Sequence, residues 1–255
     1  MKKIFSFIFA LLLVIYTNAQ RNELGISLGG ANSIGDIGTG NYINPFPVKT
    51  SNYDNVKAPI SLGLLYRFNF NPHMGIRANL AYAHVVATDK KSAEKYKIER
   101  SKSFSNSIFE GSLLFEYNFF NINDIQERSH SPYIFGGIGL AMYNKLAINY
   151  NDKNNTISYV NDGKESTLVL PIGIGYKYRF NYNWIISVET GFRYTNKDNL
   201  DYNNLSINNP EDLEDYQIQD IYRKSRFGNL SNNDWYVITG FTLTYSFGRP
   251  ACYCN

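Results

Sequence analysis

The sequence predicts an all-β protein, an eight-stranded antiparallel transmembrane β-barrel of outer-membrane type. The clearest strand is 235–247, in which apolar and aromatic residues occupy one parity and mostly small or polar residues the other. Successive side chains of a strand point to opposite faces, so this pattern predicts one apolar and one polar face. This strand has about 13 residues, which is longer than the roughly five or six residues of a strand in a soluble protein. The length suits a strand that is tilted across a bilayer. Aromatic residues near both ends, including Trp235 and Tyr245, are typical of membrane-barrel girdles.

The first residues of the chain form a separate unit. Lys2 and Lys3 precede an apolar run that ends at Tyr16, and small residues follow at 17–19. This order is that of a secretory signal peptide, which is removed from the mature protein and is not a membrane span. The predicted division is a signal peptide at 1–19 and an outer-membrane barrel at 20–255, with a periplasmic tail at 248–255.

Composition excludes two classes of protein. Beyond the leader, no stretch approaches the roughly 18 consecutive apolar residues of a membrane-spanning helix. The chain has 25 basic residues, two of them in the leader, against 22 acidic residues. This near-neutral balance gives no indication of nucleic-acid binding. The mean hydropathy of -0.33 is compatible with barrel strands, whose polar lumen face dilutes the apolar signal.

Seven further segments repeat the alternation seen in the last strand. In 166–180, for example, Ile172 and Ile174 oppose Gly173 and Lys177. The eight predicted strands are 23–30, 58–68, 73–86, 105–119, 133–148, 166–180, 184–194 and 235–247.

The connections between these strands alternate in length. Short turns at 69–72 and 181–183 contrast with long polar segments, and a connector of intermediate length covers 120–132. The predicted long loops are 31–57, 87–104, 149–165 and 195–233. This asymmetry is that of a barrel with short periplasmic turns and long outer loops. An even number of strands then places both ends of the mature chain in the periplasm.

A soluble sandwich or lipocalin would show the same alternation. Its apolar face would point into a core, and its outer face would carry many Lys and Glu residues. Here the second face is rich in Gly, Ser and Ala with isolated charges, which suits a narrow lumen. The sequence therefore favours the membrane barrel, with outer-membrane lipid against its apolar face.

The charged residues on the lumen parity are the first candidate site. Opposite charges in so narrow a barrel should pair and plug the interior, because an unpaired buried charge is costly. The alternatives are an ion path or a catalytic cleft, which are disfavoured because side chains fill the interior of an eight-stranded barrel. The predicted network consists of Arg67, Arg77, Glu110, Glu116, Lys177, Glu189 and Arg193, with Arg179 on the same face.

An enzymatic role depends on the three histidines, since some outer-membrane barrels are similar to lipid A deacylases or acyltransferases that use histidine with serine. His73 and His130 fall in a predicted turn and connector, and His84 shares the parity of Leu80 and Tyr82, towards lipid near the outer rim. A nucleophilic serine needs a base within hydrogen-bond reach and a third group to orient it. No such set converges in the sequence, so we expect no enzymatic activity and no cofactor.

Two predicted loops are candidate contact surfaces. The segment 195–233 holds seven acidic and four basic residues, whereas 87–104 is net basic. Asn209, Pro210 and Glu211 resemble a helix start, with a cap, a proline at the first position and acids in the first turn. The loops either fold on each other across the barrel mouth or dock a partner, and the sequence leaves both open.

The two cysteines of the chain, Cys252 and Cys254, follow the last strand. One intervening residue would strain a disulfide between them. A metal pair lacks a nearby histidine and the wider spacing of structural sites. The pattern favours two tail thiols, free or paired with a partner.

The two ends of the mature chain carry distinctive residues. The first strand begins Glu23-Leu24-Gly25-Ile26, and the last ends at Phe247 before Gly-Arg-Pro-Ala-Cys-Tyr-Cys. In these features the chain resembles the PorG-type outer-membrane proteins of the Bacteroidetes type IX secretion system. The resemblance implies a non-enzymatic barrel that associates with a periplasmic ring, made of a lipoprotein and its partner, through periplasmic turns and the tail. The tail residues expected at this contact are Arg249, Pro250, Cys252, Tyr253 and Cys254.

The alternative is a general small outer-membrane barrel of the OmpA or OmpW type, acting in envelope integrity or adhesion through its long outer loops. The face that binds a partner separates the two hypotheses. A secretion component should act through its periplasmic tail and turns, and an adhesin through 195–233.

Overall fold

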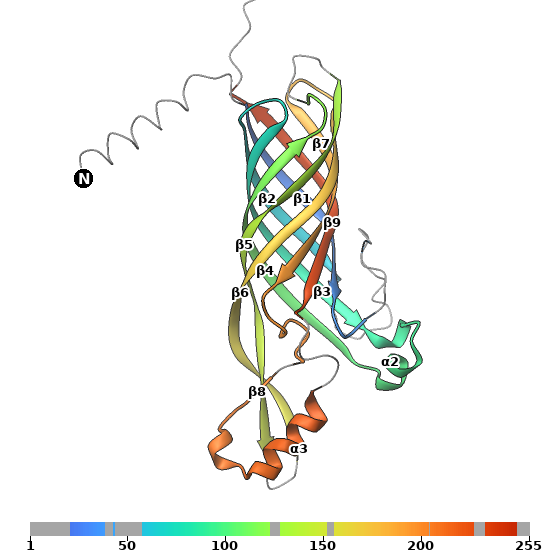
Figure 1. Cartoon of the computed structure of the whole chain (residues 1–255), viewed down its shortest axis with the longest axis vertical. Coiled ribbons are helices and arrows are strands. Elements are labelled where there is room, and N and C mark those ends of the chain that lie inside the picture. The colour runs from blue at the N-terminus through green and yellow to red at the C-terminus, as the bar shows by residue number, and fades with distance from the viewer. Residues whose placement is uncertain are drawn as a thin grey trace, which may run out of the picture.

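The computed structural model describes residues 21–38, 43, 58–122, 128–151, 156–203, 205–226 and 233–248. Within them, eight antiparallel strands form a closed ring, in which each strand pairs with the next and β9 returns to β1 (Figure 1). The strands of the ring are β1 (Arg21–Ile34), β2 (Ile60–Asn69), β3 (Met74–Thr88), β4 (Ser103–Asn118), β5 (Ser129–Asn151), β6 (Thr156–Arg179), β7 (Trp184–Thr195) and β9 (Trp235–Phe247). The predicted eight-stranded barrel is confirmed. The predicted signal peptide lies outside the described residues.

The ring closes between β1 and β9, which pair along the whole of β9. Within this seam Gly29 faces Gly240, and a Cβ atom on either glycine would collide with the backbone of the facing strand. A residue with a side chain would force the two strands apart here, so the glycine pair permits the close approach.

The outward face of the ring is apolar on every strand. Leu28 is 60% exposed, Leu140 63% and Ile174 65%. Soluble proteins rarely leave so continuous an apolar surface in water, and the band is that of a barrel embedded in lipid. Its other members include Leu24, Ile26, Leu62, Leu64, Leu80, Phe109, Leu113, Phe115, Ile138, Ile172, Val188 and Phe241.

Aromatic side chains lie at both rims of this band. At the rim that carries the short turns, Trp184 packs edge-on against Tyr245 with ring centroids 5.1 Å apart. At the opposite rim, Tyr194 and Trp235 pack in the same way at 5.0 Å. Membrane barrels carry their interfacial girdles at these two levels.

The two ends of the barrel differ strongly (Figure 1). The turn end carries the short connections after β2 and β6, together with the start of β1 and the end of β9. The loop end carries the long connections and the helices. Both described chain ends therefore lie at the turn end.

The segment 149–165, predicted to be a loop, is instead a β-hairpin that projects beyond the barrel. β5 continues to Asn151 and β6 begins at Thr156, and the two pair throughout apart from a bulge between Asn144 and Leu146. β6 pairs with β7 only from Val169 onward. The projecting part is polar because it has no lipid face, and this concealed its strand character.

The predicted long loop 195–233 contains regular structure that packs on this hairpin. β8 (Ser206–Ile207) adds to β5 in parallel, and α3 (Asp215–Ser225) follows. Ile148 of β5, Ile207 of β8 and Ile221 of α3 meet in one buried cluster. The hairpin and α3 thus form a subdomain at the loop end with its own apolar core.

The predicted helix start at Asn209 is displaced. A 3-10 turn, η2 (Pro210–Asp212), does begin with the proline, but Asn209 adopts a left-handed conformation and its side chain makes no capping bond. The longer helix begins at Asp215, where Glu214 and Gln217 form a reciprocal capping box. This arrangement satisfies two backbone donors at the helix start.

The predicted charged loop 87–104 also contains short helices, η1 (Asp89–Lys91) and α2 (Lys95–Arg100). Within the described residues, no helix is long and apolar enough to cross a membrane. The buried carboxylate of Asp89 accepts hydrogen bonds from Gly38 N at 3.1 Å, Arg100 Nε at 2.8 Å and Lys102 N at 3.2 Å. It therefore fastens this connection to the segment that follows β1.

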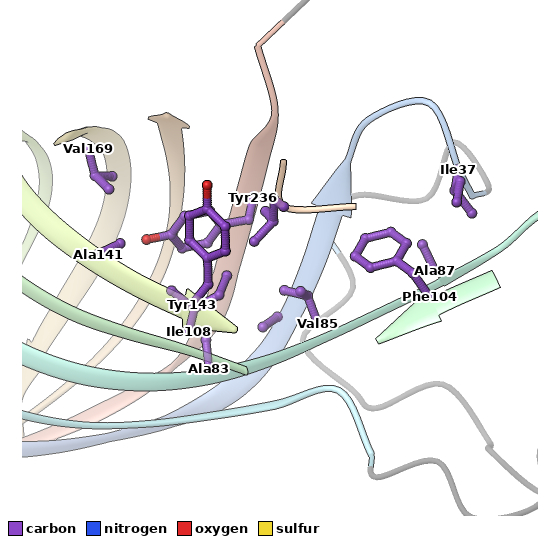
Figure 2. Packing of buried hydrophobic residues seen from close by; sticks show 12 residues of the cluster. Ile37, Ala83, Val85, Ala87, Phe104, Ile108, Ala141, Tyr143, Val169 and Tyr236 are labelled. Carbon is purple, nitrogen blue, oxygen red and sulfur yellow. The ribbon is translucent and has the colours of Figure 1, made fainter. Parts of the chain in front are cut away.

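Apolar residues fill the loop end of the lumen (Figure 2). Leu200, from the β7–β9 connection, is buried among them, and its carbonyl accepts a hydrogen bond of 3.1 Å from Asn106 Nδ2 of β4. The connection therefore folds into the barrel mouth. The cluster comprises Ala31, Ile37, Ala83, Val85, Ala87, Phe104, Ile108, Ala141, Tyr143, Val169, Leu200 and Tyr236.

Candidate functional site

Glu116, on β4, is the centre of a buried charge network in the turn half of the lumen. Its carboxylate contacts three cations from three other strands. Arg67 Nε lies 2.7 Å away, Arg77 Nη1 2.9 Å and Lys177 Nζ 2.6 Å. All four side chains are almost fully buried. The alternation of each strand turns these residues inward, and the small diameter of the barrel brings them together.

Two further carboxylates complete the network. Arg77 Nη1 lies 2.7 Å from Glu189, and Arg67 Nη1 forms an ion pair with Glu23. Three cations thus face three carboxylates in one contiguous group. An equal number of opposite charges is the arrangement that a low-dielectric interior tolerates best.

Neutral and aromatic side chains support these ion pairs. Tyr133 OH donates to Glu189 Oε2 at 2.6 Å, and the Tyr133 ring lies 4.2 Å from Lys177 Nζ. The ring of Phe135 lies 4.9 Å from the Arg77 guanidinium. Cation–π contacts of this kind stabilise a desolvated cation further.

Glu110 and Arg193 form a second, smaller group nearer the loop end. Arg193 Nε lies 3.3 Å from Glu110 Oε2. Tyr236 OH and Ser112 Oγ each donate to the same carboxylate at 2.7 Å. This carboxylate is therefore held by one cation and two hydroxyl groups.

Arg179 serves the turn end in a different way. Its Nε donates to Ile122 O and its Nη1 to Tyr182 O, both at 2.9 Å. The guanidinium thereby ties two turn-end connections together.

The structure thus places all seven residues of the predicted network, and Arg179, in the lumen. Sequence reasoning missed Glu23, Tyr133 and Tyr236 as partners, although all three share the lumen parity of their strands. The described cavity that reaches Glu189 and Arg193 measures about 20 Å³, which is room for about one water molecule. The small volume of this cavity fits the predicted plug, which stays a prediction.

The three histidines lie apart from this network. His73 is in the β2–β3 turn, where its Nδ1 lies 2.9 Å from Asn118 O, and His130 is exposed at the start of β5. His84 has the outward parity that was predicted, yet it is buried, and its Nδ1 lies 3.0 Å from Ser107 Oγ. Ser107 Oγ also lies 3.1 Å from Tyr82 OH. This serine–histidine contact was not anticipated, and the absence of enzymatic activity stays a prediction.

A cluster of three aspartates lies at the loop end. Asp198 and Asp201 belong to the β7–β9 connection, and Asp234 immediately precedes β9. One carboxylate oxygen from each of the three lies within 4.8 Å of those of the other two. Burial raises the pKa of Asp198 to about 6, and that of Asp201 to about 7. Burial and the two neighbouring aspartates raise the pKa of Asp234 to about 8. The sequence analysis counted Asp198 and Asp201 only among the acids of a long loop.

The predicted tail contacts, Arg249, Pro250, Cys252, Tyr253 and Cys254, lie outside the described residues. Gly248, the last described residue, has a φ of 81°, a left-handed conformation that glycine adopts without strain. The extended conformation of β9 therefore ends at Gly248, at the turn end of the barrel.

Comparison with known proteins identifies one family and several solved structures. The model of the family described as "Domain of unknown function (DUF6089)" matches residues 2–255. No curated protein sequence matches the chain.

Three of the matching solved structures are outer-membrane or surface proteins. Ail, the attachment invasion locus protein of Yersinia pestis, solved in complex with the heparin analogue sucrose octasulfate, shares 12% identity at a TM-score of 0.41, over 89% of this chain and 99% of that one. Neisserial surface protein A shares 9% identity at a TM-score of 0.43, over 90% and 98%. A major outer membrane protein from Thermus thermophilus shares 11% identity at a TM-score of 0.42, over 90% and 100%. At such identities and scores, nothing of these proteins' individual activities is carried to this chain.

Proposed function

The chain belongs to the DUF6089 family, and we propose that it is a non-enzymatic outer-membrane barrel of the type IX protein secretion system that contacts a periplasmic ring through its turn end. The single observation that carries this proposal is the place of the chain ends. β1 starts and β9 ends at the turn end, so Gly248, the residue to which the tail is joined, lies at the rim that carries the short turns. In outer-membrane barrels the short turns face the periplasm.

The plugged lumen supports a scaffolding role. Glu116 and its three cations occupy the interior of the turn half, so a partner has the rim and the tail available to it. The short turns at the rim are held by defined contacts. Asn71 Oδ1 accepts from the backbone N–H groups of His73 and Met74, each at 2.8 Å, and Arg179 joins the other connections. A rigid rim loses little conformational entropy when it binds a partner.

The sequence resemblance described above supplies the identity of the proposed partner, a ring lipoprotein with its associated protein. It rests on the two chain ends, Glu23 to Ile26 and the tail beyond Phe247. Glu23 also has a structural role, because it forms an ion pair with Arg67 inside the lumen. Of the two chain ends that carry the resemblance, the tail is therefore the one that we propose contacts the partner.

An affinity purification from outer membranes tests the proposal. The tag is inserted between Asn151 and Thr156, at the tip of the projecting hairpin, so that the C-terminus stays free. We expect ring proteins to co-purify with the full chain and to be lost when residues 249–255 are deleted. A matched control is the substitution Tyr216→Ala on α3, a residue that is 70% exposed at the other end of the molecule; it should leave the co-purification intact. A barrel recovered alone, with normal secretion in a deletion strain, would exclude the secretion role.

The second candidate function is a general outer-membrane barrel that acts through its outer loops. The observation that favours it is the subdomain of the β5–β6 hairpin, β8 and α3, which has its own buried cluster and projects beyond the barrel (Figure 1). Exposed aromatic residues on it, Tyr159 and Tyr216, would be the contacts. If Tyr216→Ala weakens cell-surface attachment while deletion of the tail does not, this second function is the correct one.

A further inference from the structure

The aspartate cluster at the loop end is assembled from segments far apart in the sequence. Asp198 and Asp201 follow β7, Asp234 precedes β9, and Gly35, which follows β1, lies beside them. Backbone hydrogen bonds hold two of the carboxylates in place. Leu200 N donates to Asp234 Oδ2 at 2.9 Å, and Asn203 N donates to Asp201 Oδ1 at 3.0 Å. The carboxylates are thus positioned by the fold and are not simply free on the surface.

Two other oxygens of the cluster have no hydrogen-bond partner within the described residues. Asp201 is 1% exposed, and its Oδ2 has no hydrogen-bond partner within the described part of the chain. Oδ2 of Asp198 is likewise buried without a described partner. Buried polar oxygens are normally hydrogen-bonded or bound to an ion. Two such oxygens on the side chains of one carboxylate cluster therefore indicate a ligand.

Within the described residues, none of the three aspartates forms an ion pair with a basic side chain. Two basic side chains of the loop end pair with other carboxylates: Lys197 with Glu165 and Arg100 with Asp89. Asp36 adds a further negative charge that acts on Asp198 and Asp201. Buried carboxylates at such distances require either bound protons or a bound cation.

Gly35 leaves space next to the carboxylates. A Cβ atom at this position would lie 2.9 Å from Asp234 Oδ1 and 3.7 Å from Asp201 Oδ2. Its backbone is outside the left-handed region, so the glycine is not required by backbone conformation. The missing side chain instead keeps the approach to these two oxygens open.

We propose that Asp198, Asp201 and Asp234 bind a Ca²⁺ ion at the mouth of the barrel. Oxygen ligands lie about 2.3–2.6 Å from Ca²⁺, so ligands on opposite sides of the ion are about 4.6–5.2 Å apart. Oxygens confined within 4.8 Å of one another fit such a shell, with water or backbone carbonyls as further ligands. Mg²⁺ demands near-ideal octahedral geometry and gives up its water reluctantly, so it is the weaker candidate.

The bound ion would fasten the β7–β9 connection into the barrel mouth. Leu200 lies between the two loop aspartates and is buried in the apolar plug, where it also contacts Asn106. A cation shared by the loop aspartates and Asp234 joins the start of this connection to its end. Removal of the ion should therefore loosen the mouth and leave the ion-paired turn half in place.

Calorimetric titration of the full, detergent-solubilised barrel, stripped with EDTA, tests the proposal directly. Ca²⁺ is added to about 10 mM, roughly tenfold above the weak limit of about 10⁻³ M for extracellular Ca²⁺ sites. We expect saturable binding to the native protein and at least tenfold weaker binding to Asp201→Asn. The matched control Asp162→Asn, on the projecting hairpin and paired with Lys145, should bind as the native protein does.

Thermal unfolding gives a second readout. Ca²⁺ should raise the unfolding temperature of the native protein and of Asp162→Asn, and have no effect on Asp201→Asn. Should Asp201→Asn fail to fold, Asp198→Asn, at the least buried of the three positions, replaces it. If Ca²⁺ neither binds to the native protein nor raises its unfolding temperature, the proposal is wrong, and the aspartates are accommodated by bound protons.

Discussion

The turn half of the lumen and the aspartate cluster at the barrel mouth bury carboxylates in opposite surroundings. In the turn half, Glu116 contacts Arg67, Arg77 and Lys177, and carboxylates and cations are equal in number. At the loop end, Asp201 and Asp234 are buried to the same degree, yet their nearest charged neighbours are other aspartates. Burial alone therefore does not determine what a carboxylate contributes. The charges around it decide whether it stabilises the fold by itself or needs a ligand.

The largest effect should follow from the loss of the central carboxylate. Glu116→Gln leaves three buried cations with only Glu23 and Glu189 between them. We expect a loss of about 3–5 kcal/mol in the free energy of unfolding, measured by urea titration of the barrel in lipid with tryptophan fluorescence. The control Glu94→Gln, at an exposed position paired with Lys97, should change this free energy by less than about 1 kcal/mol. Equal stability of the two variants would contradict the central role of Glu116.

The tyrosines that donate to buried carboxylates should show a smaller effect. Tyr133→Phe removes the donor to Glu189, and Tyr236→Phe removes the donor to Glu110. Each should cost about 1.5–3 kcal/mol, the usual contribution of a hydrogen bond to a charged group. Tyr159→Phe, at an exposed position of the hairpin, is the comparison and should leave stability unchanged. If the two lumen variants unfold at the same urea concentration as the native protein, water replaces the missing hydroxyl groups.

Neutralising Asp201 should raise the free energy of unfolding, whereas neutralising Glu116 should lower it. In EDTA at about pH 8, Asp201→Asn should stabilise the barrel by on the order of 1 kcal/mol, because it removes one of several like charges in a buried cluster. The same urea titration measures it. Neutralising a carboxylate thus destabilises one end of the lumen and stabilises the other. A destabilised Asp201→Asn variant in EDTA would show that the carboxylate already has a compensating partner.

The smallest effect on the barrel itself should come from the projecting subdomain. Ile221→Ala opens a cavity in the cluster that joins α3 to Ile148 and Ile207, at a local cost of about 2–5 kcal/mol. The barrel strands do not depend on this cluster, so the urea midpoint of the barrel should be unchanged. Limited proteolysis should instead cleave α3 faster than in the native protein. A lower urea midpoint would mean that the subdomain and the barrel unfold together.

Much of the barrel follows from local pattern. Strand alternation placed Ile174 outward and Lys177 inward, and the structure confirms the eight strands to within a few residues at most ends. The same parity contained Glu23, which the sequence analysis considered only as part of a terminal motif. The projecting strands of the hairpin were missed because a clear alternation of apolar and polar residues appears only where one whole face of a strand is buried, and the projecting part has no lipid face.

The chemistry of the loop end depends on contacts that no local pattern encodes. A strand and a helix separate the segment of Asp198 and Asp201 from Asp234. Nothing in the sequence spacing of these residues predicts that their carboxylates meet. The contact of His84 with Ser107 likewise depends on the register between β3 and β4. The narrow interior predicts that the lumen charges pair, but the sequence does not show which charges are partners.

The sequence by itself determined which side chains face lipid and which face the lumen, because a strand turns successive residues to opposite sides whatever surrounds it. It also determined which end carries the short turns, since loop length is a property of the chain. Only the tertiary structure decided which charges pair. Closure of the ring sets the register between neighbouring strands, and that register brings Glu116 to its three cations and the three aspartates to one another.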